Sequence, residues 1–226
     1  MPNGLVNTIG IIGAGRVGTA VARQALKAGY DVLLATSRPP SEIKLIVDFT
    51  APGAKAVTAE TAARDSDLVV ITVPLGKYRT LRPGTFAGRI VVDAMNYWPP
   101  TDGTIPEFEG PHASSEVIQA FLPAARLVRT LNHIGYHELE EEGLPPGHPE
   151  RRALAIAGND KEARAVVAAF VDRLGYDPVD AGELRNSRKF VTGTRIFAGR
   201  HGRESMERLL ADQPARLEAP QSQDAP

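Results

Sequence analysis

Short apolar runs alternate with segments of helical periodicity along most of the chain. The runs with the length and composition of strands are TIGIIG (8–13), DVLLAT (31–36), AKAVT (54–58), LVVITVP (68–74), IVVDAM (90–95) and RLVRTLN (126–132). Apolar residues at helical spacing occur in 16–28, 41–52, 59–66 and 114–125. Nearly continuous apolar strands are typical of a parallel sheet that is covered on both faces. The alternation therefore predicts an α/β fold with a doubly wound, mostly parallel sheet.

The last third of the chain predicts a smaller α/β extension. A loop rich in Pro, Gly and Glu (137–150) is followed by a strand (153–158), a helix (161–175), a second strand (177–182) and a mostly helical segment (183–211). The glutamate run in the loop, 140–142, is expected to be a solvated surface. We expect a first domain over 1–136, a substrate-side region over 151–211 and a disordered, proline-rich tail over 212–226.

A glycine-rich turn connects the first strand to the first helix. Its pattern is G-x-G-x-x-G, formed by Gly13, Gly15, Arg16, Val17 and Gly18. In a strand–turn–helix context the first glycine permits the tight turn, the second lets the backbone approach a pyrophosphate, and the third lets the helix pack closely. The helix N-terminus then stabilises the phosphate charge. The pattern predicts a Rossmann dinucleotide-binding unit.

The residues after the second strand indicate which dinucleotide binds. An NAD site usually has Asp or Glu there, whereas this chain has Thr36, Ser37 and Arg38, and its first carboxylate is Glu42. Two hydroxyls and a guanidinium can bind a 2′-phosphate, which a carboxylate would repel. We therefore expect NADP(H).

Two more segments lie where parallel strands end, which is where ligands bind in open α/β sheets. Val73, Pro74 and Leu75 close the fourth predicted strand and should line the nicotinamide side of the cleft. Met95 and Asn96 close the fifth and are assigned to the same cofactor site.

Composition excludes several other kinds of chemistry. The chain has no cysteine, which rules out disulfides, thiolate metal sites and a cysteine nucleophile. No histidine or carboxylate spacing predicts a metal site. A formal net charge of −1 gives no reason to expect a nucleic-acid or membrane partner. With no signal-like opening and no apolar stretch of about 18 residues, the expected location is the cytoplasm.

The chain resembles a known family over about residues 7–190. The signs are G-x-G-x-x-G, T-S-R after the second strand, V-P after the fourth, Leu131-Asn132-His133-Ile134, and a D-A-G-x-L-x-N-S-R motif at 180–188. Together they resemble the NADP oxidoreductases that act on the deazaflavin coenzyme F420. The resemblance implies direct hydride transfer between NADP(H) and coenzyme F420 in a cleft lined by Val73, Pro74 and residues 132–134.

His133 and Asn132 are the candidate catalytic residues. If the substrate needs a proton, as a small carbonyl or imine would, His133 is the best general-acid candidate; otherwise its imidazole only hydrogen-bonds the cofactor or backbone. Tyr97 and Trp98 either stack on a planar ring or cap a hydrophobic edge.

Three functions stay open at this point: F420-type hydride transfer, reduction of a small carbonyl or imine, and non-catalytic NADPH sensing. Residues 183–208 carry seven basic and three acidic side chains, which suggests either an acidic substrate tail or a solvated face. Because the region after residue 185 is short for a substrate domain, we expect a homodimer whose second copy supplies the missing wall.

Overall fold

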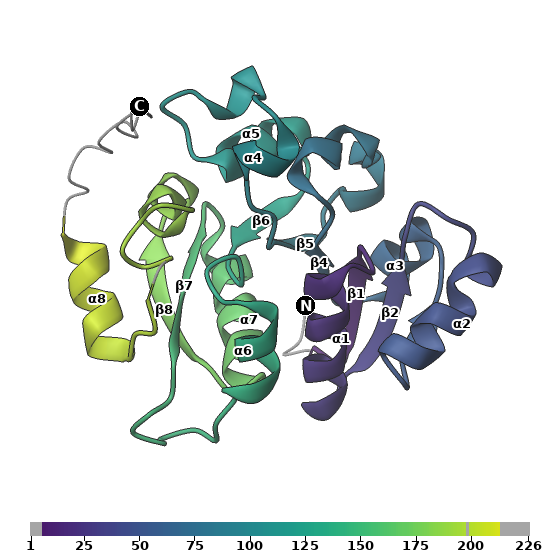
Figure 1. Cartoon of the computed structure of the whole chain (residues 1–226), viewed down its shortest axis with the longest axis horizontal. Helices are drawn as coiled ribbons and strands as arrows, with labels where there is room; N and C mark the ends of the chain where they lie inside the picture. The colour runs from purple at the N-terminus through teal and green to yellow at the C-terminus, as the bar shows by residue number, and fades with distance from the viewer. Residues whose placement is uncertain (1–5, 198, 213–226) are drawn as a thin grey trace, which may run out of the picture.

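One eight-stranded sheet runs through the molecule (Figure 1). The structure, a computed structural model, describes residues 6–197 and 199–212. The strands are β1 (Thr8–Ile12), β2 (Asp31–Ala35), β3 (Lys55–Ala56), β4 (Leu68–Ile71), β5 (Ile90–Asp93), β6 (Arg126–Arg129), β7 (Ala153–Gly158) and β8 (Asp177–Gly182). The α-helices are α1 (Arg16–Lys27), α2 (Pro40–Thr50), α3 (Ala59–Asp65), α4 (Pro99–Asp102), α5 (Ser114–Phe121), α6 (Tyr136–Glu141), α7 (Lys161–Arg173) and α8 (Arg203–Ala211). The 3-10 helices are η1 (Leu75–Thr80), η2 (Pro83–Phe86), η3 (Pro106–Phe108) and η4 (Leu184–Phe190).

The sheet has the doubly wound topology that the sequence predicts. Its strand order is β3-β2-β1-β4-β5-β6-β7-β8, so α2 and α8 lie at opposite ends of it (Figure 1). The order changes direction between β1 and β4, which is the switch point where ligands bind in open α/β sheets. All neighbouring strands are parallel except β6 and β7, which are antiparallel.

Helices bury both faces of the sheet, as the apolar strands require. Val21 of α1, Val47 of α2 and Phe170 of α7 are buried in one core cluster. Ala63 of α3 and Ile118 of α5 belong to the cluster on the other side. The strands between them carry apolar side chains on both faces, which explains why LVVI and IVVD read as continuous hydrophobic runs.

The strand β7 runs antiparallel to β6, and this change of direction determines where the C-terminal region lies. Val128 of β6 pairs with Gly158 at the end of β7, so the beginning of β7 lies at the edge where β1 to β6 end. After η4 the chain comes back to this edge through residues 191–197 and 199–202, which we call the return segment. Phe190 and Ile196, both buried, hold it against β7 and β8 in a third apolar cluster. The C-terminal region thus extends the same sheet.

Two sequence predictions need correction. The loop expected at 137–150 begins with the helix α6, where Leu139 is buried in the cluster that also contains α1; its acidic composition concealed the helix. The segment expected to be mostly helical at 183–211 contains only η4 and α8, separated by the return segment. Of the tail predicted at 212–226, residues 213–226 lie outside the described residues.

Some apolar side chains remain exposed on α2. Leu45, Ile46 and Phe49 are 81%, 48% and 85% exposed. The homodimer expected from the sequence stays a prediction. Among the described residues no helix has the length and apolar character needed to cross a bilayer.

The glycines of the first turn give a test of the fold. A Cβ at Gly18 would lie 1.8 Å from the carbonyl oxygen of Gly13, whereas one at Gly15 would meet nothing within 4 Å. Alanine usually stabilises a helix interior relative to glycine. We nevertheless expect Gly18→Ala to lower the free energy of unfolding by about 1–3 kcal/mol, because the backbone must shift. Urea denaturation measures it.

The matched control is Gly15→Ala, which should unfold at nearly the same urea concentration as the natural chain. Equal stability of both variants would contradict the close approach of α1 to the first turn.

Candidate active site

A cleft of about 1440 Å³ lies along the edge where β1, β2, β4, β5 and β6 end. Sites for a single small molecule usually have about 300–1,000 Å³, so this cleft has room for a dinucleotide and a second molecule. The sequence-predicted residues that line it are Gly13, Gly15, Arg16, Val17, Thr36, Ser37, Arg38, Val73, Pro74, Leu75, Met95, Asn96, Asn132 and His133. Gly18 lies behind this surface, buried against Gly13.

The first turn fits a pyrophosphate. Gly13 has φ +120°, which favours glycine, and a Cβ there would lie 2.7 Å from Thr72 Oγ1. Gly15 is the N-cap of α1, and a Cβ on it would stand in the open space that a phosphate would occupy. The first turn of α1 has neither a side-chain cap nor an acidic residue. Its N–H groups are therefore available to an anion, as this motif requires.

The segment after β2 fits the 2′-phosphate of NADP(H). Ser37 and Arg38 are exposed in the cleft, and the Arg38 N–H donates to Thr36 Oγ1 at 3.0 Å, which fixes the turn. Lys77 and Arg82 also line the cleft, and Arg82 is paired with Glu60 of α3 at 2.9 Å. Sequence reasoning missed both, because only the fold brings η1 and the following turn opposite β2.

A buried ion pair lies beneath the middle of the cleft. Arg129 at the end of β6 contacts Asp93 at the end of β5, with 2.9 Å between Nη1 and Oδ2. Both side chains are at most 1% exposed. The Ser115 hydroxyl donates to Asp93 at 2.8 Å, and Arg129 Nη2 donates to Asn96 Oδ1 at 3.1 Å. The pair thus joins two strand ends and connects them to Asn96, which lines the cleft.

Asn96 in turn holds the loop that follows β6. Its Nδ2 donates to the Asn132 carbonyl at 2.7 Å. Asn132 Nδ2 donates to the Phe190 carbonyl at 2.8 Å, which ties the loop to the end of η4. Leu131 has φ 62°, an uncommon conformation for a residue with a branched side chain. Such strain persists only where the surroundings fix the backbone, as these hydrogen bonds do.

The structure argues against a general-acid role for His133. Its ring is 2% exposed and lies 5.0 Å from the ring of Phe190. Nδ1 lies 3.1 Å from Asn132 Oδ1, and Nε2 accepts the Ala155 N–H at 3.0 Å. This pattern requires the neutral ring with the proton on Nδ1. Burial, with the nearby charges of Arg152, Arg129 and His201, lowers the pKa of His133 to about 3. His133 and Asn132 thus shape the cleft wall as a bonded pair.

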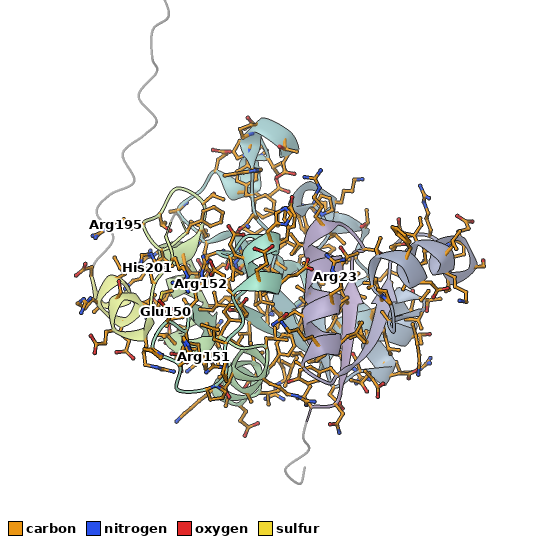
Figure 2. The ribbon with its side chains drawn as sticks, turned by 60° about the horizontal axis from the view of Figure 1, so that its bottom comes forward. Arg23, Glu150, Arg151, Arg152, Arg195 and His201 are labelled. Carbon is orange, nitrogen blue, oxygen red and sulfur yellow. The ribbon has the colours of Figure 1, made fainter. Side chains whose placement is uncertain are left out.

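The far end of the cleft is organised by Arg152, which the sequence analysis did not single out. Arg152, just before β7, is 8% exposed at its side chain and donates to the carbonyls of His133 and Gly199 at 3.3 Å. It also contacts Glu142 at 3.1 Å, and Glu142 contacts Arg200 at 3.3 Å. Figure 2 shows Arg152 on the side of the molecule formed by the C-terminal elements, away from Arg23 on α1.

These contacts correct several sequence interpretations. Glu140 and Glu142 are not merely solvated, because they pair with Arg23 and Arg152. Phe197, Gly199 and Arg200 of this chain line the end of the cleft for which we expected a second copy, and the homodimer itself stays a prediction.

The C-terminal arginines are largely paired with carboxylates. Arg203 lies 3.8 Å from Asp177 and 3.9 Å from Glu207, and Arg200 contacts Glu142. Of the arginines in 183–208, Arg200 lines the cleft. The local excess of basic residues therefore does not form a positively charged face on the cleft.

The D-A-G-x-L-x-N-S-R motif lies at the end of β8, away from the cleft. Because β8 runs parallel to β7, it ends at the opposite edge of the sheet. The motif forms a turn in which the Gly182 N–H donates to Asp180 Oδ1 at 2.8 Å and Asn186 Nδ2 donates to the Ala181 carbonyl at 2.7 Å. It redirects the chain toward the return segment.

The two aromatic residues after β5 have different positions. The Tyr97 hydroxyl bonds to Glu109 and accepts the Ile105 N–H at 2.9 Å, while its ring packs on Phe108. Tyr97 is thus a structural cap. Trp98 is 51% exposed and lines the cleft, with its ring centroid 6.1 Å from that of Phe197.

A Rossmann sheet, a phosphate-binding first turn and a basic 2′-phosphate end together define a nucleotide site of the NADP-dependent oxidoreductases. Comparison with known proteins agrees. Residues 8–97 match the family model "NADP oxidoreductase coenzyme F420-dependent". The resemblance predicted from the sequence is confirmed over these residues.

Relatives extend the similarity over most of the chain. The rat metalloreductase STEAP3 is 24% identical over 183 residues, which cover 80% of this chain and 35% of that protein. The chain spans 20% of a glyoxylate reductase from Thermococcus kodakarensis, with 44% identity over 71 residues. It therefore spans about a third or less of the length of these curated relatives.

Two solved structures have a similar fold. A hypothetical protein from Sinorhizobium meliloti has a TM-score of 0.73 and 27% identity, over 88% of this chain and 96% of that one. A protein from Arthrobacter sp. FB24, described as a candidate F420-dependent NADP reductase, has a TM-score of 0.69 and 23% identity, over 81% and 87%. The second likeness shows the shared fold.

Substitution of Arg38 tests whether this end of the cleft binds the 2′-phosphate. A charge-assisted hydrogen bond contributes about 1.5–3 kcal/mol, or roughly ten- to a hundredfold in affinity. We expect Arg38→Ala to weaken NADPH binding by that factor and to leave NADH binding nearly unchanged, measured by calorimetric titration. Arg208→Ala, on α8 at the other end of the sheet, is the control. Equal losses for NADPH and NADH would show that Arg38 acts through the fold.

The pH dependence of the free energy of unfolding tests whether His133 is buried in its neutral form. Since its folded pKa of about 3 lies below the ordinary value of 6.5, the unfolded chain binds a proton between these values and the folded chain does not. The contribution of His133 to the free energy of unfolding is therefore fully present above pH 6.5. It falls by about 1.4 kcal/mol for each pH unit below that value. Urea unfolding between pH 7.5 and 5.5 should therefore show a steeper loss for the natural chain than for His133→Gln.

The control for that experiment is His112→Gln, because the His112 side chain is 71% exposed. It should keep the slope of the natural chain. If His133→Gln keeps it as well, His133 is protonated normally in the folded protein and could act as an acid.

Proposed function

We propose that this protein is an oxidoreductase that transfers hydride directly between NADP(H) and the deazaflavin ring of coenzyme F420. The cofactor half of the proposal rests on the glycine turn, on Thr36 to Arg38, and on the matched family model. The assignment of coenzyme F420 as the acceptor is supported by the description of the family model, which names this coenzyme. The assay below tests this assignment.

The observation that carries the acceptor assignment is the state of His133. Reduction of a carbonyl normally needs a proton donor beside the nascent alkoxide. Here the candidate donor is neutral, buried and bonded at both ring nitrogens. A deazaflavin takes the hydride at a ring carbon and a proton from water at a ring nitrogen, while NADPH becomes NADP⁺. Such a reaction needs a cleft that aligns two rings, which is a proximity mechanism.

The described residues supply this alignment. Val73 and Pro74, which follow β4, and the loop at 132–134, which follows β6, both line the cleft. Hydrogen bonds from Asn96 and to Phe190 fix the loop backbone, so the wall against which the rings pack changes little on binding. The chain binds and orients the reactants and excludes water from between them.

The test is NADPH oxidation followed at 340 nm with four kinds of acceptor: coenzyme F420, its tail-less deazaflavin core, free flavins, and a panel of small ketones and imines. We expect turnover with coenzyme F420 and its core, and at most slow reaction with the carbonyls and imines. Turnover of a ketone or imine alone would replace this proposal with a carbonyl or imine reductase. NADPH binding with no oxidation by any acceptor would make the protein an NADPH sensor.

Arg38→Ala belongs in the same assay as a control. It should raise the KM for NADPH and leave the ranking of the acceptors unchanged, since it lies at the other end of the cleft.

A further inference from the structure

Two aromatic side chains lie close together at the end of the cleft where we place the acceptor. Trp98 follows β5 and Phe197 belongs to the return segment, so about a hundred residues of chain separate them. Their ring centroids are 6.1 Å apart with an interplanar angle of 55°. Both line the cleft. A tilted pair of this kind presents aromatic surface to a third ring.

The exposure of Trp98 needs an explanation. Trp98 is 51% exposed although it is the largest apolar side chain that lines the cleft. A large aromatic side chain left open in a cleft is typical of a binding surface. Tyr97, its neighbour in sequence, is partly buried and its hydroxyl and ring both have partners within the protein, whereas more than half of Trp98 is open.

Hydrogen bonds fix the backbone segments that carry the two rings. The Trp98 N–H donates to Asp102 Oδ2 at 2.8 Å, which makes Trp98 the capped start of α4. The Phe197 N–H donates to Thr194 Oγ1 at 3.3 Å. Ile196 is 2% exposed and anchors the return segment next to Phe197. The Thr192 hydroxyl donates to the Tyr97 carbonyl at 3.3 Å and so joins the two segments directly.

The polar groups around this pair leave no strong excess of positive charge. Arg152 and Arg200 are paired with Glu142, and Asp102 and Glu138 also line this end. An anionic tail would therefore find little to bind deep in the cleft. Aromatic stacking, by contrast, depends on the ring alone and tolerates a neutral environment.

We propose that Trp98 and Phe197 form an aromatic clamp that selects planar, fused-ring hydride acceptors over small aliphatic ones. This inference rests on the proposed function for the reaction, but it names the feature of the acceptor that is recognised. The clamp binds the ring system, and the charged tail of an intact coenzyme lies outside it.

The chain offers a direct readout, because Trp98 is its one tryptophan. In protein saturated with NADP⁺, which does not absorb tryptophan emission, the tail-less deazaflavin core should quench the fluorescence as it binds. A small aliphatic ketone at the same concentration should leave it unchanged. Unchanged emission at saturating core, with binding shown by equilibrium dialysis, would overturn the clamp.

Variants test the energetic role. Loss of one stacking partner should raise the KM for the deazaflavin core about tenfold in Trp98→Ala and leave the KM for NADPH unchanged. Trp98→Phe should restore most of the affinity, since it keeps an aromatic face. Phe197→Leu should resemble Trp98→Ala. The matched control is Phe49→Ala, because Phe49 is 85% exposed on α2 at the other end of the sheet.

The outcomes separate the clamp from the proposed function. If deazaflavin is reduced equally well by the natural chain and Trp98→Ala, hydride transfer stands and the clamp fails. If planar rings quench Trp98 but accept no hydride, the clamp stands and the proposed function fails. If Trp98→Ala lowers stability and raises both KM values together, the aromatic pair is only a structural cap and the clamp is overturned.

Discussion

The buried ion pair between Asp93 and Arg129 is the interaction on which the cleft depends. Removing two charges from water is costly, and breaking such a pair by deleting one partner typically costs about 3–5 kcal/mol. Each member of the pair makes a further hydrogen bond, Asp93 with Ser115 and Arg129 with Asn96, while Arg129 Nε has no hydrogen-bond partner among the described residues. Through Asn96 the pair determines the path of the loop at 131–134. A polar network in the core therefore shapes the surface that faces the ligands.

The nucleotide end of the cleft could largely be predicted from the sequence, because its strands and motifs are recognised from short stretches of chain. The strands at 8–12, 31–35, 68–71 and 90–93 appear where apolar runs indicated them. Gly13, Gly15 and Gly18 could be recognised because their spacing places them in one turn between a strand and a helix, although the contact that requires glycine at position 13 comes from the distant Thr72. Thr36 to Arg38 follow β2 directly, so their place at the cleft could also be read from one strand end.

The acceptor half could not be predicted in this way, because it depends on contacts between distant segments. Nothing local distinguishes Arg152 from other loop arginines until β7 pairs antiparallel with β6. His133 looked like a general acid since it follows a strand, but the Ala155 N–H and the Asn132 side chain engage its ring. The D-A-G-x-L-x-N-S-R motif, one of the signs of the family resemblance, is a turn at the far edge of the sheet.

The late position of the return segment has a consequence for how the protein is made. Chains emerge from the ribosome N-terminus first at about 5–20 residues per second. The strands that precede the glycine turn and Thr36 to Arg38 are synthesised long before Phe197, Gly199 and Arg200, which line the opposite end of the cleft. The segments that line the nucleotide end of the cleft are therefore made first, and the cleft is complete only when the return segment has emerged and packed against β7 and β8.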